Sequence, residues 1–193
     1  MVKKDILLNG IVVGEHDASG DNLEDTKAVQ AILKEKGLYQ EVTANDAMFN
    51  QANAFAAVAN DLYKRDLKKP PFKGISVSPF VVNAVFSIEL YLKAIHNSYG
   101  NRIKGHHLVS IYKGMPKKGK EYFLSAANDV RPHYQLYDGA DIHSCLESLN
   151  KSFEQWRYVY EHNELGTELQ SIRYTMHTSH EACCRVRESV KKT

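Results

Sequence analysis

One arginine–histidine pair has the residue types that metal-free cleavage of a phosphodiester requires. Arg157 and His162 are separated by four residues, late in an amphipathic stretch. A guanidinium can neutralise a phosphate and stabilise a pentavalent intermediate. An imidazole can accept the proton of an RNA 2′-hydroxyl or protonate the 5′-oxygen leaving group. The pair therefore has the minimal chemistry of a metal-independent ribonuclease.

The spacing of this pair is not specific by itself. Arg102 with His107 and Arg173 with His180 also have four to six intervening residues. Three such pairs exceed only slightly the one or so that chance gives for seven arginines and nine histidines in 193 residues. The context favours Arg157, because it follows an F-x-x-W segment near the end of the sequence.

Glu89 and Lys93 are two charged residues within an otherwise apolar stretch. They lie one helical turn apart. Burial of charges is costly unless they are paired or used. One interpretation is an (i, i+4) ion pair at the surface of a bundle. The other is a pair that positions a bound molecule in a groove.

A third candidate is the stretch from Arg102 to Lys120, which contains six basic residues and no acidic one. The whole chain has a net charge of only +2, which argues against indiscriminate wrapping of nucleic acid. A local basic stretch can still contact an anion, although a solvated loop and helix face is the alternative. The predicted RNA or phosphate ligands are Arg102, Lys104, His106, His107, Lys113, Lys117 and Lys118.

A metal site is a weaker hypothesis. His177, Glu181 and Cys184 share one face of a predicted helix, and imidazole, carboxylate and thiolate together can hold Zn²⁺. A fourth ligand and any C-x-x-C pair are missing, so the alternative is a helix whose cysteines are small buried side chains. Neither a P-loop nor a dinucleotide-binding glycine pattern occurs. We predict no metal and no cofactor.

The elements that must position these residues are mostly helical. Asn9-Gly10 between two short apolar runs predicts a hairpin of residues 6–8 and 11–13. Periodic apolar positions, together with caps and glycine stops, predict helices afterwards. The predicted helices are 23–36, 43–65 with Thr43 as the cap, 79–97 with Ser78 as the cap, 108–112, 120–129, a long helix from 141 that Gly166 ends, and 168–190.

The predicted fold class is therefore all-α: an antiparallel helical bundle with a short N-terminal β-hairpin. Residues 1–43 would hold the hairpin and the first helix, and residues 44–193 the bundle, within one compact domain. Three cysteines and no run of 18 apolar residues predict a cytoplasmic protein that does not enter a membrane.

Three segments of the sequence resemble the HEPN superfamily. They are S-I-E-L-Y-L-K-A at 87–94, K-G-H-H-L-V-S-I-Y at 104–112 and F-E-Q-W-R-Y-V-Y-E-H at 153–162. The resemblance covers roughly residues 44–190 and implies an antiparallel helical bundle. Where active members often have a small polar residue after the arginine, this chain has Tyr158.

The resemblance implies a metal-independent endoribonuclease of a toxin or phage-defence system. Arg157 and His162 would be the catalytic pair, and Glu89 the polar residue that the central helix adds. A homodimer would join two such pairs in one cleft, and RNA and an antitoxin or other protein are the implied partners. Two alternatives remain: a noncatalytic module that binds nucleotide, RNA or protein, and a helical scaffold that dimerises through the apolar 79–97 helix.

Overall fold

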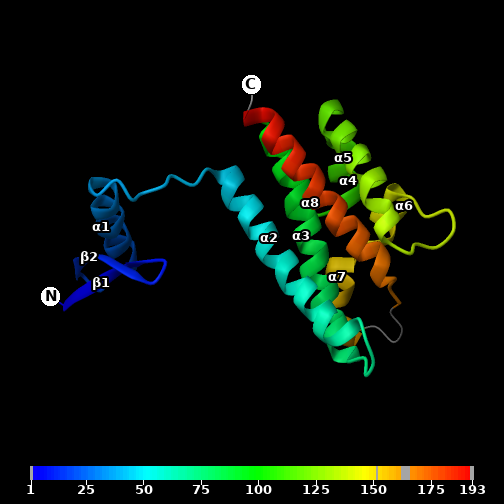
Figure 1. Cartoon of the computed structure of the whole chain (residues 1–193), viewed down its shortest axis with the longest axis horizontal. Coiled ribbons are helices and arrows are strands. Elements are labelled where there is room, and N and C mark those ends of the chain that lie inside the picture. The colour runs from blue at the N-terminus through cyan, green and yellow to red at the C-terminus, as the bar shows by residue number, and fades with distance from the viewer. Residues whose placement is uncertain (1, 151, 162–165, 192–193) are drawn as a thin grey trace. The chain divides into compact units, whose positions relative to one another are not determined.

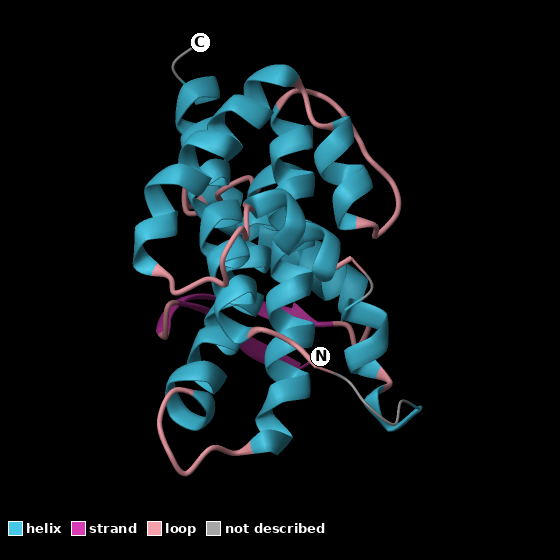
Figure 2. Cartoon of the chain, turned by 90° about the vertical axis from the view of Figure 1, so that its right-hand side faces the viewer, coloured by secondary structure: helices cyan, strands magenta, loops and turns pink. Residues whose placement is uncertain are grey.

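The computed structural model describes residues 2–150, 152–161 and 166–191, and it divides into two compact units. The first unit is Met1–Val42 and the second is Thr43–Thr193. Within the described residues the chain is mostly helical, and the strands are confined to the N-terminal hairpin (Figure 2). The predicted class, helical with a short hairpin, is confirmed at this level.

The N-terminal unit consists of an antiparallel hairpin and one helix. Strands β1 (Val2–Leu8) and β2 (Ile11–Ala18) extend well beyond the predicted 6–8 and 11–13. Asn9 and Gly10 form the turn with φ values of 52° and 81°, which is the left-handed backbone that a two-residue hairpin turn requires. Helix α1 (Asn22–Glu35) begins at the side chain of Asp21, which accepts from two backbone N–H groups.

The second unit is a helical bundle built on two long helices near its middle (Figure 1). The helices are α2 (Ala44–Leu62), which a π-helical turn continues through Tyr63–Leu67, α3 (Val77–Ser98), α4 (Leu108–Gly114), α5 (Lys117–Val130), α6 (Ile142–Ser148), α7 (Ser152–Arg157) and α8 (Leu169–Lys191). Single 3₁₀ turns lie at Gly74–Ser76, Arg131–His133 and Val159–Glu161. Helix α3 packs against α2, α8, α7 and α4, and α8 also packs against α5.

Helix α3 is the centre of the core. Its apolar side chains point in nearly every direction, as expected for a helix that neighbours enclose. The segment Gly74–Ser98 is, among the described residues, the one helix long and apolar enough to cross a membrane, but 61% of its most apolar window is buried inside the bundle. The apolar surplus that suggested a dimerising scaffold is thus largely covered by the chain's own helices.

The long helix predicted from residue 141 is wrong. The structure has α6, α7 and the 3₁₀ turn Val159–Glu161 instead. Helix α6 packs on α4 and α8, whereas α7 packs on α3. Because the two halves of the apolar stripe face different partners, one straight helix could not bury both.

The predicted cap of the central helix is also wrong. Helix α3 begins at Val77, and the hydroxyl of Ser78 donates to the carbonyl oxygen of Trp156 at 2.5 Å. That bond ties the start of α3 to α7. The Thr43 cap of α2 is confirmed, because its side chain accepts from the backbone N–H of Asp46 at 3.0 Å.

Candidate functional site

The carboxylate of Glu89 is buried at the middle of α3. Only 3% of this side chain is exposed, and it has two cationic or potentially cationic partners. The ammonium of Lys93 donates to Oε1 at 2.7 Å, and Nδ1 of His106 lies 3.0 Å from Oε1 and 3.2 Å from Oε2. The predicted ion pair therefore exists, and it is part of a three-residue cluster.

His106 joins this buried carboxylate to the surface. Its side chain is 72% exposed, although Nδ1 contacts Glu89. The preceding Gly105 has a φ of +90°, a conformation that L side chains rarely adopt, and this turn directs the chain from the loop toward α3. A carboxylate that holds Nδ1 fixes the orientation of the ring and leaves Nε2 as the atom that can exchange a proton.

This arrangement suits proton transfer at the surface. A carboxylate also holds Nδ1 of the histidine in a catalytic triad, where it fixes the orientation of the ring. The ammonium of Lys93 shares the same carboxylate and limits its negative charge. The cluster therefore has the parts of a general acid or base that contacts its substrate through Nε2 of His106.

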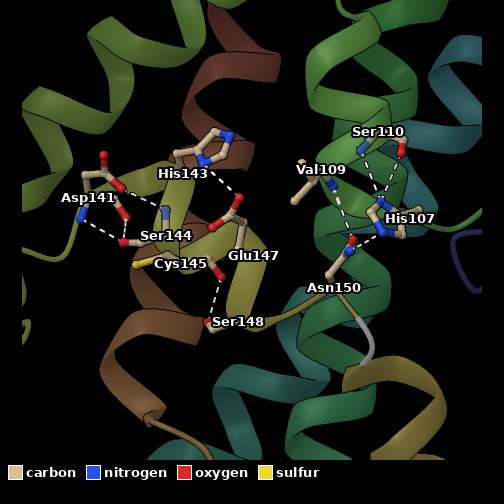
Figure 3. A network of polar contacts seen from close by, with 10 residues as sticks. All are labelled: His107, Val109, Ser110, Asp141, His143, Ser144, Cys145, Glu147, Ser148 and Asn150. Carbon is tan, nitrogen blue, oxygen red and sulfur yellow. Dashed lines mark hydrogen bonds and ion pairs between the residues drawn. The ribbon is translucent and has the colours of Figure 1, made fainter.

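The neighbouring His107 is held more tightly. Its Nδ1 accepts from the backbone N–H of Ser110 at 3.3 Å and lies 3.0 Å from the Ser110 hydroxyl, so the ring caps the start of α4. Its Nε2 contacts the side-chain amide of Asn150, whose Oδ1 accepts from the N–H of Val109 (Figure 3). Both ring nitrogens of His107 are therefore used in fixing α4 to the chain after α6.

The basic residues of the stretch 102–120 belong to the loop after α3 and to α4 and α5. The ammonium of Lys120 donates to the carbonyl oxygen of Lys113 at 2.7 Å, which joins the end of α4 to α5. The other predicted cations have exposed side chains: Arg102, Lys104, Lys113, Lys117 and Lys118. Their exposure fits both a surface that contacts an anion and a solvated face.

Arg157 ends α7, and its guanidinium is stacked on aromatic rings. It lies 5.1 Å from the ring centre of Phe153 and 4.7 Å from that of Tyr158. No ion pair joins Arg157 to Glu161, although both are described and their spacing would permit one. Phe153 in turn packs against Phe86 of α3 at 5.5 Å, one turn before Glu89. The predicted partner His162 lies outside the described residues.

The three residues of the metal hypothesis have separate partners. His177 receives a contact from the Tyr134 hydroxyl at 3.1 Å, Glu181 pairs with Arg185, and Cys184 lies 3.6 Å from Nε2 of His180. Within the described residues, no group of three or more potential ligands is placed to hold a metal ion.

The sequence singled out most residues of this site, but it did not predict which of them contact one another. The isolated charges of Glu89 and Lys93 were visible in the apolar stretch, and His106 stood in the basic one. Nothing in the spacing joined His106 to Glu89, since a loop makes that connection. Comparison with protein families, curated proteins and solved structures finds no match to this chain.

Proposed function

We propose that this chain is an HEPN-like protein that acts on RNA and cleaves it without a metal ion. The observation that carries the proposal is the buried Glu89 carboxylate that orients the exposed ring of His106 beside the basic residues 102–120. The described parts of the three segments that resemble the superfamily lie on α3, at α4, and on α7 with the turn that follows it, and α4 and α7 both pack on α3. Both the resemblance and the chemistry therefore favour the same region.

In the proposed reaction, Nε2 of His106 takes the proton of a 2′-hydroxyl. The 2′-oxygen then attacks the adjacent phosphorus, and the bond from phosphorus to the 5′-oxygen breaks. The products are a 2′,3′-cyclic phosphate and a 5′-hydroxyl, whose proton comes from a second imidazole, for which His162 is the candidate. Arg157 neutralises the charge that develops on the phosphate oxygens.

A homodimer is part of the proposal, because it brings Arg157 and His162 from both chains to one cleft. The resemblance further suggests a toxin or phage-defence role, with an antitoxin or another protein as the partner. The basic stretch 102–120 would contact the RNA backbone.

The test is incubation of the full chain with single-stranded RNA in the presence of EDTA. We expect cleavage to a cyclic phosphate, and a loss of about 100-fold or more in His106→Gln, as typical for removal of a general acid or base. Glu89→Gln keeps the shape of the side chain and should reduce cleavage to a smaller extent. His133→Gln is the matched control, since His133 is also an exposed histidine that follows a helix.

Each other outcome changes the assignment. If His106→Gln still cleaves RNA but Arg157→Ala and His162→Ala do not, Arg157 and His162 are the catalytic residues and His106 is not one of them. Salt-dependent RNA binding without cleavage would identify a noncatalytic module. Neither cleavage nor binding would reject an action on RNA.

The noncatalytic module is the second candidate, and one observation favours it. Lys93 shares the carboxylate of Glu89, and both ring nitrogens of His107 are used in holding α4. Networks of this kind also occur where polar side chains only fix a helix in place. The same RNA-binding assay separates the two candidates.

A further inference from the structure

A groove lies between α2 and α8, over the side of α3 that is nearly opposite to Glu89. Both helices pack along α3 but contact each other little, and α2 presents the small side chains of Ala56 and Ala57 at this point. The result is a cavity of about 380 Å³. That volume lies within the range that small-molecule sites occupy.

Aromatic rings form much of the wall of this groove. Tyr91 comes from α3, Tyr134 from the segment after α5, and His177 and His180 from α8. His180 lies 5.4 Å from the ring of Tyr91 at an angle of 76°, and Tyr134 lies 6.0 Å from His177 at 70°. Rings fixed at such angles present both faces and edges to a planar guest.

Two amides of α2 supply the hydrogen-bonding groups. Asn53 accepts from the Tyr91 hydroxyl at 2.6 Å through Oδ1, which leaves its Nδ2 as a donor. Within the part of the chain that the structure describes, the amide of Asn60 bonds to no other side chain or backbone group. A primary amide offers a donor and an acceptor side by side, which match the edge of a nitrogen heterocycle.

The lining carries no permanent charge. Burial lowers the pKa of His177 and of His180, so both rings are neutral near pH 7. The neighbouring cation Arg173 does not line the groove, and its guanidinium is stacked 4.0 Å over the ring of Tyr63 and 5.2 Å from that of Tyr134. An ion would find no counter-charge among the lining residues, and an uncharged ligand would need none.

We propose that the α2–α8 groove binds an uncharged planar nitrogen heterocycle of nucleobase or nucleoside size. The heterocycle stacks against Tyr134 and the two histidines over a floor formed by the buried Tyr91, and its edge bonds to the free groups of Asn53 and Asn60. The site is independent of the RNA-cleaving proposal. Tyr91 and Glu89 are two residues apart on α3, and about 100° per residue places them on nearly opposite sides of that helix.

The probes are adenosine, cytidine and uridine, added separately to the full chain and followed by the NMR signals of the histidine rings. We expect at least one of them to shift the His177 and His180 signals saturably, with a Kd in the millimolar range or tighter. Ala57→Leu fills the groove and should weaken binding about tenfold or more. Ala54→Leu is the matched control, because it is an exposed alanine of α2 that does not line the groove.

Asn60→Ala removes the amide without adding bulk, and it should weaken binding about fivefold or more if the edge contact is made. If Ala57→Leu is unfolded, Asn60→Ala alone tests whether the groove binds the nucleoside. The proposal is overturned if no nucleoside gives a saturable shift up to about 5 mM, or if Ala57→Leu or Asn60→Ala binds as the wild type does. A loss of RNA cleavage in His106→Gln has no bearing on this result.

Discussion

The two histidines of the α2–α8 groove stand in surroundings that disfavour their charged forms. His180 packs between Phe49, 6.0 Å away, and Tyr91. Burial lowers its pKa below the ordinary 6.5, and the neighbouring Glu181 opposes this effect. The pKa of His177 is lowered in the same way, with a contribution from His180.

A pH dependence of stability follows. The unfolded chain binds protons at these two histidines from about pH 6.5 downward, whereas the folded chain binds them only at lower pH. The free energy of unfolding should therefore be highest well above pH 6.5 and should fall as the pH is lowered through about 6.5, the pKa of the two histidines in the unfolded chain. Urea unfolding of the wild type and of His180→Gln over this range measures the effect, and the variant should lose less stability on acidification.

Carboxylates do not obscure this window. Hydrogen bonds from Arg65, Ser76 and Lys73 lower the pKa of the buried Asp66, and the backbone and side chain of Ser144 lower that of Asp141, both from 3.8. Their stabilising contributions are lost as the pH falls through about 3.8, well below the pH at which the histidines titrate in the unfolded chain. An identical pH slope in wild type and His180→Gln would contradict the assignment to His180.

Single residues were predictable where their type was unusual for their surroundings. Glu89 and Lys93 stood out because the rest of α3 is apolar, and their pairing follows from helical spacing. The contact between His106 and Glu89 depends on the backbone of the loop at Gly105, which no periodicity encodes. The α2–α8 groove could not be predicted from the sequence for a related reason, because its lining residues come from three helices and a loop.

At the scale of elements, the start of α5 is fitted closely against α3. Gly119 is buried, and a Cβ added there would lie 3.0 Å from Cγ of Met115 and 3.1 Å from Cγ2 of Ile95. Ile95 is fully buried in α3 and has little room to move. Gly119 does not have a left-handed backbone conformation, so its backbone does not require glycine. The absence of a side chain instead allows α5 to pack closely against α3.

Gly119→Ala should destabilise the protein although alanine is the better helix former. The propensity gain is at most about 1 kcal/mol, whereas overpacking of a core typically costs about 1–3 kcal/mol. We expect the free energy of unfolding to fall by about 1 kcal/mol, measured by urea denaturation. Lys118→Ala, at an exposed position of the same turn, should change it by less than about 0.5 kcal/mol. An increase in the free energy of unfolding of Gly119→Ala would contradict this expectation, because it would show that the side chains of Met115 and Ile95 can shift to accommodate the methyl group.

The continuous helices α2 and α8 were predicted closely, and the stretch that is divided into α6 and α7 was not. The cap at Thr43 and the periodicity of α2 and α8 give their positions within a few residues. Between residues 141 and 161 the apolar period continues, but α6 and α7 pack on different neighbours. A periodic pattern reports which residues are buried, and it does not report whether they are buried against one surface or two.

At the scale of the whole molecule, the two units have separate interiors. Among the described buried hydrophobic side chains, Ile6 alone belongs to the N-terminal unit, and the others lie between Ala52 and Val186. The bundle core is therefore complete without residues 1–42. The sequence had suggested one compact domain.

A chain of residues 43–193 should fold by itself. We expect its near-ultraviolet circular dichroism to retain the bundle's aromatic signals, and its thermal unfolding to stay cooperative. Loss of the near-ultraviolet signal with retained helicity would indicate a molten bundle, and it would show that the first 42 residues contribute to the core.

The position of α8 has a consequence for synthesis of the chain. Helix α8 covers α3 and α5, yet roughly 70 residues separate Ser98 from Leu169, so about 4–14 s of translation pass before its first residue is added. During that interval the nascent chain carries α3 incompletely covered, and this segment has the length and apolar character of a membrane-spanning helix. We therefore expect the nascent chain to be most prone to aggregation between the completion of α3 and the emergence of α8.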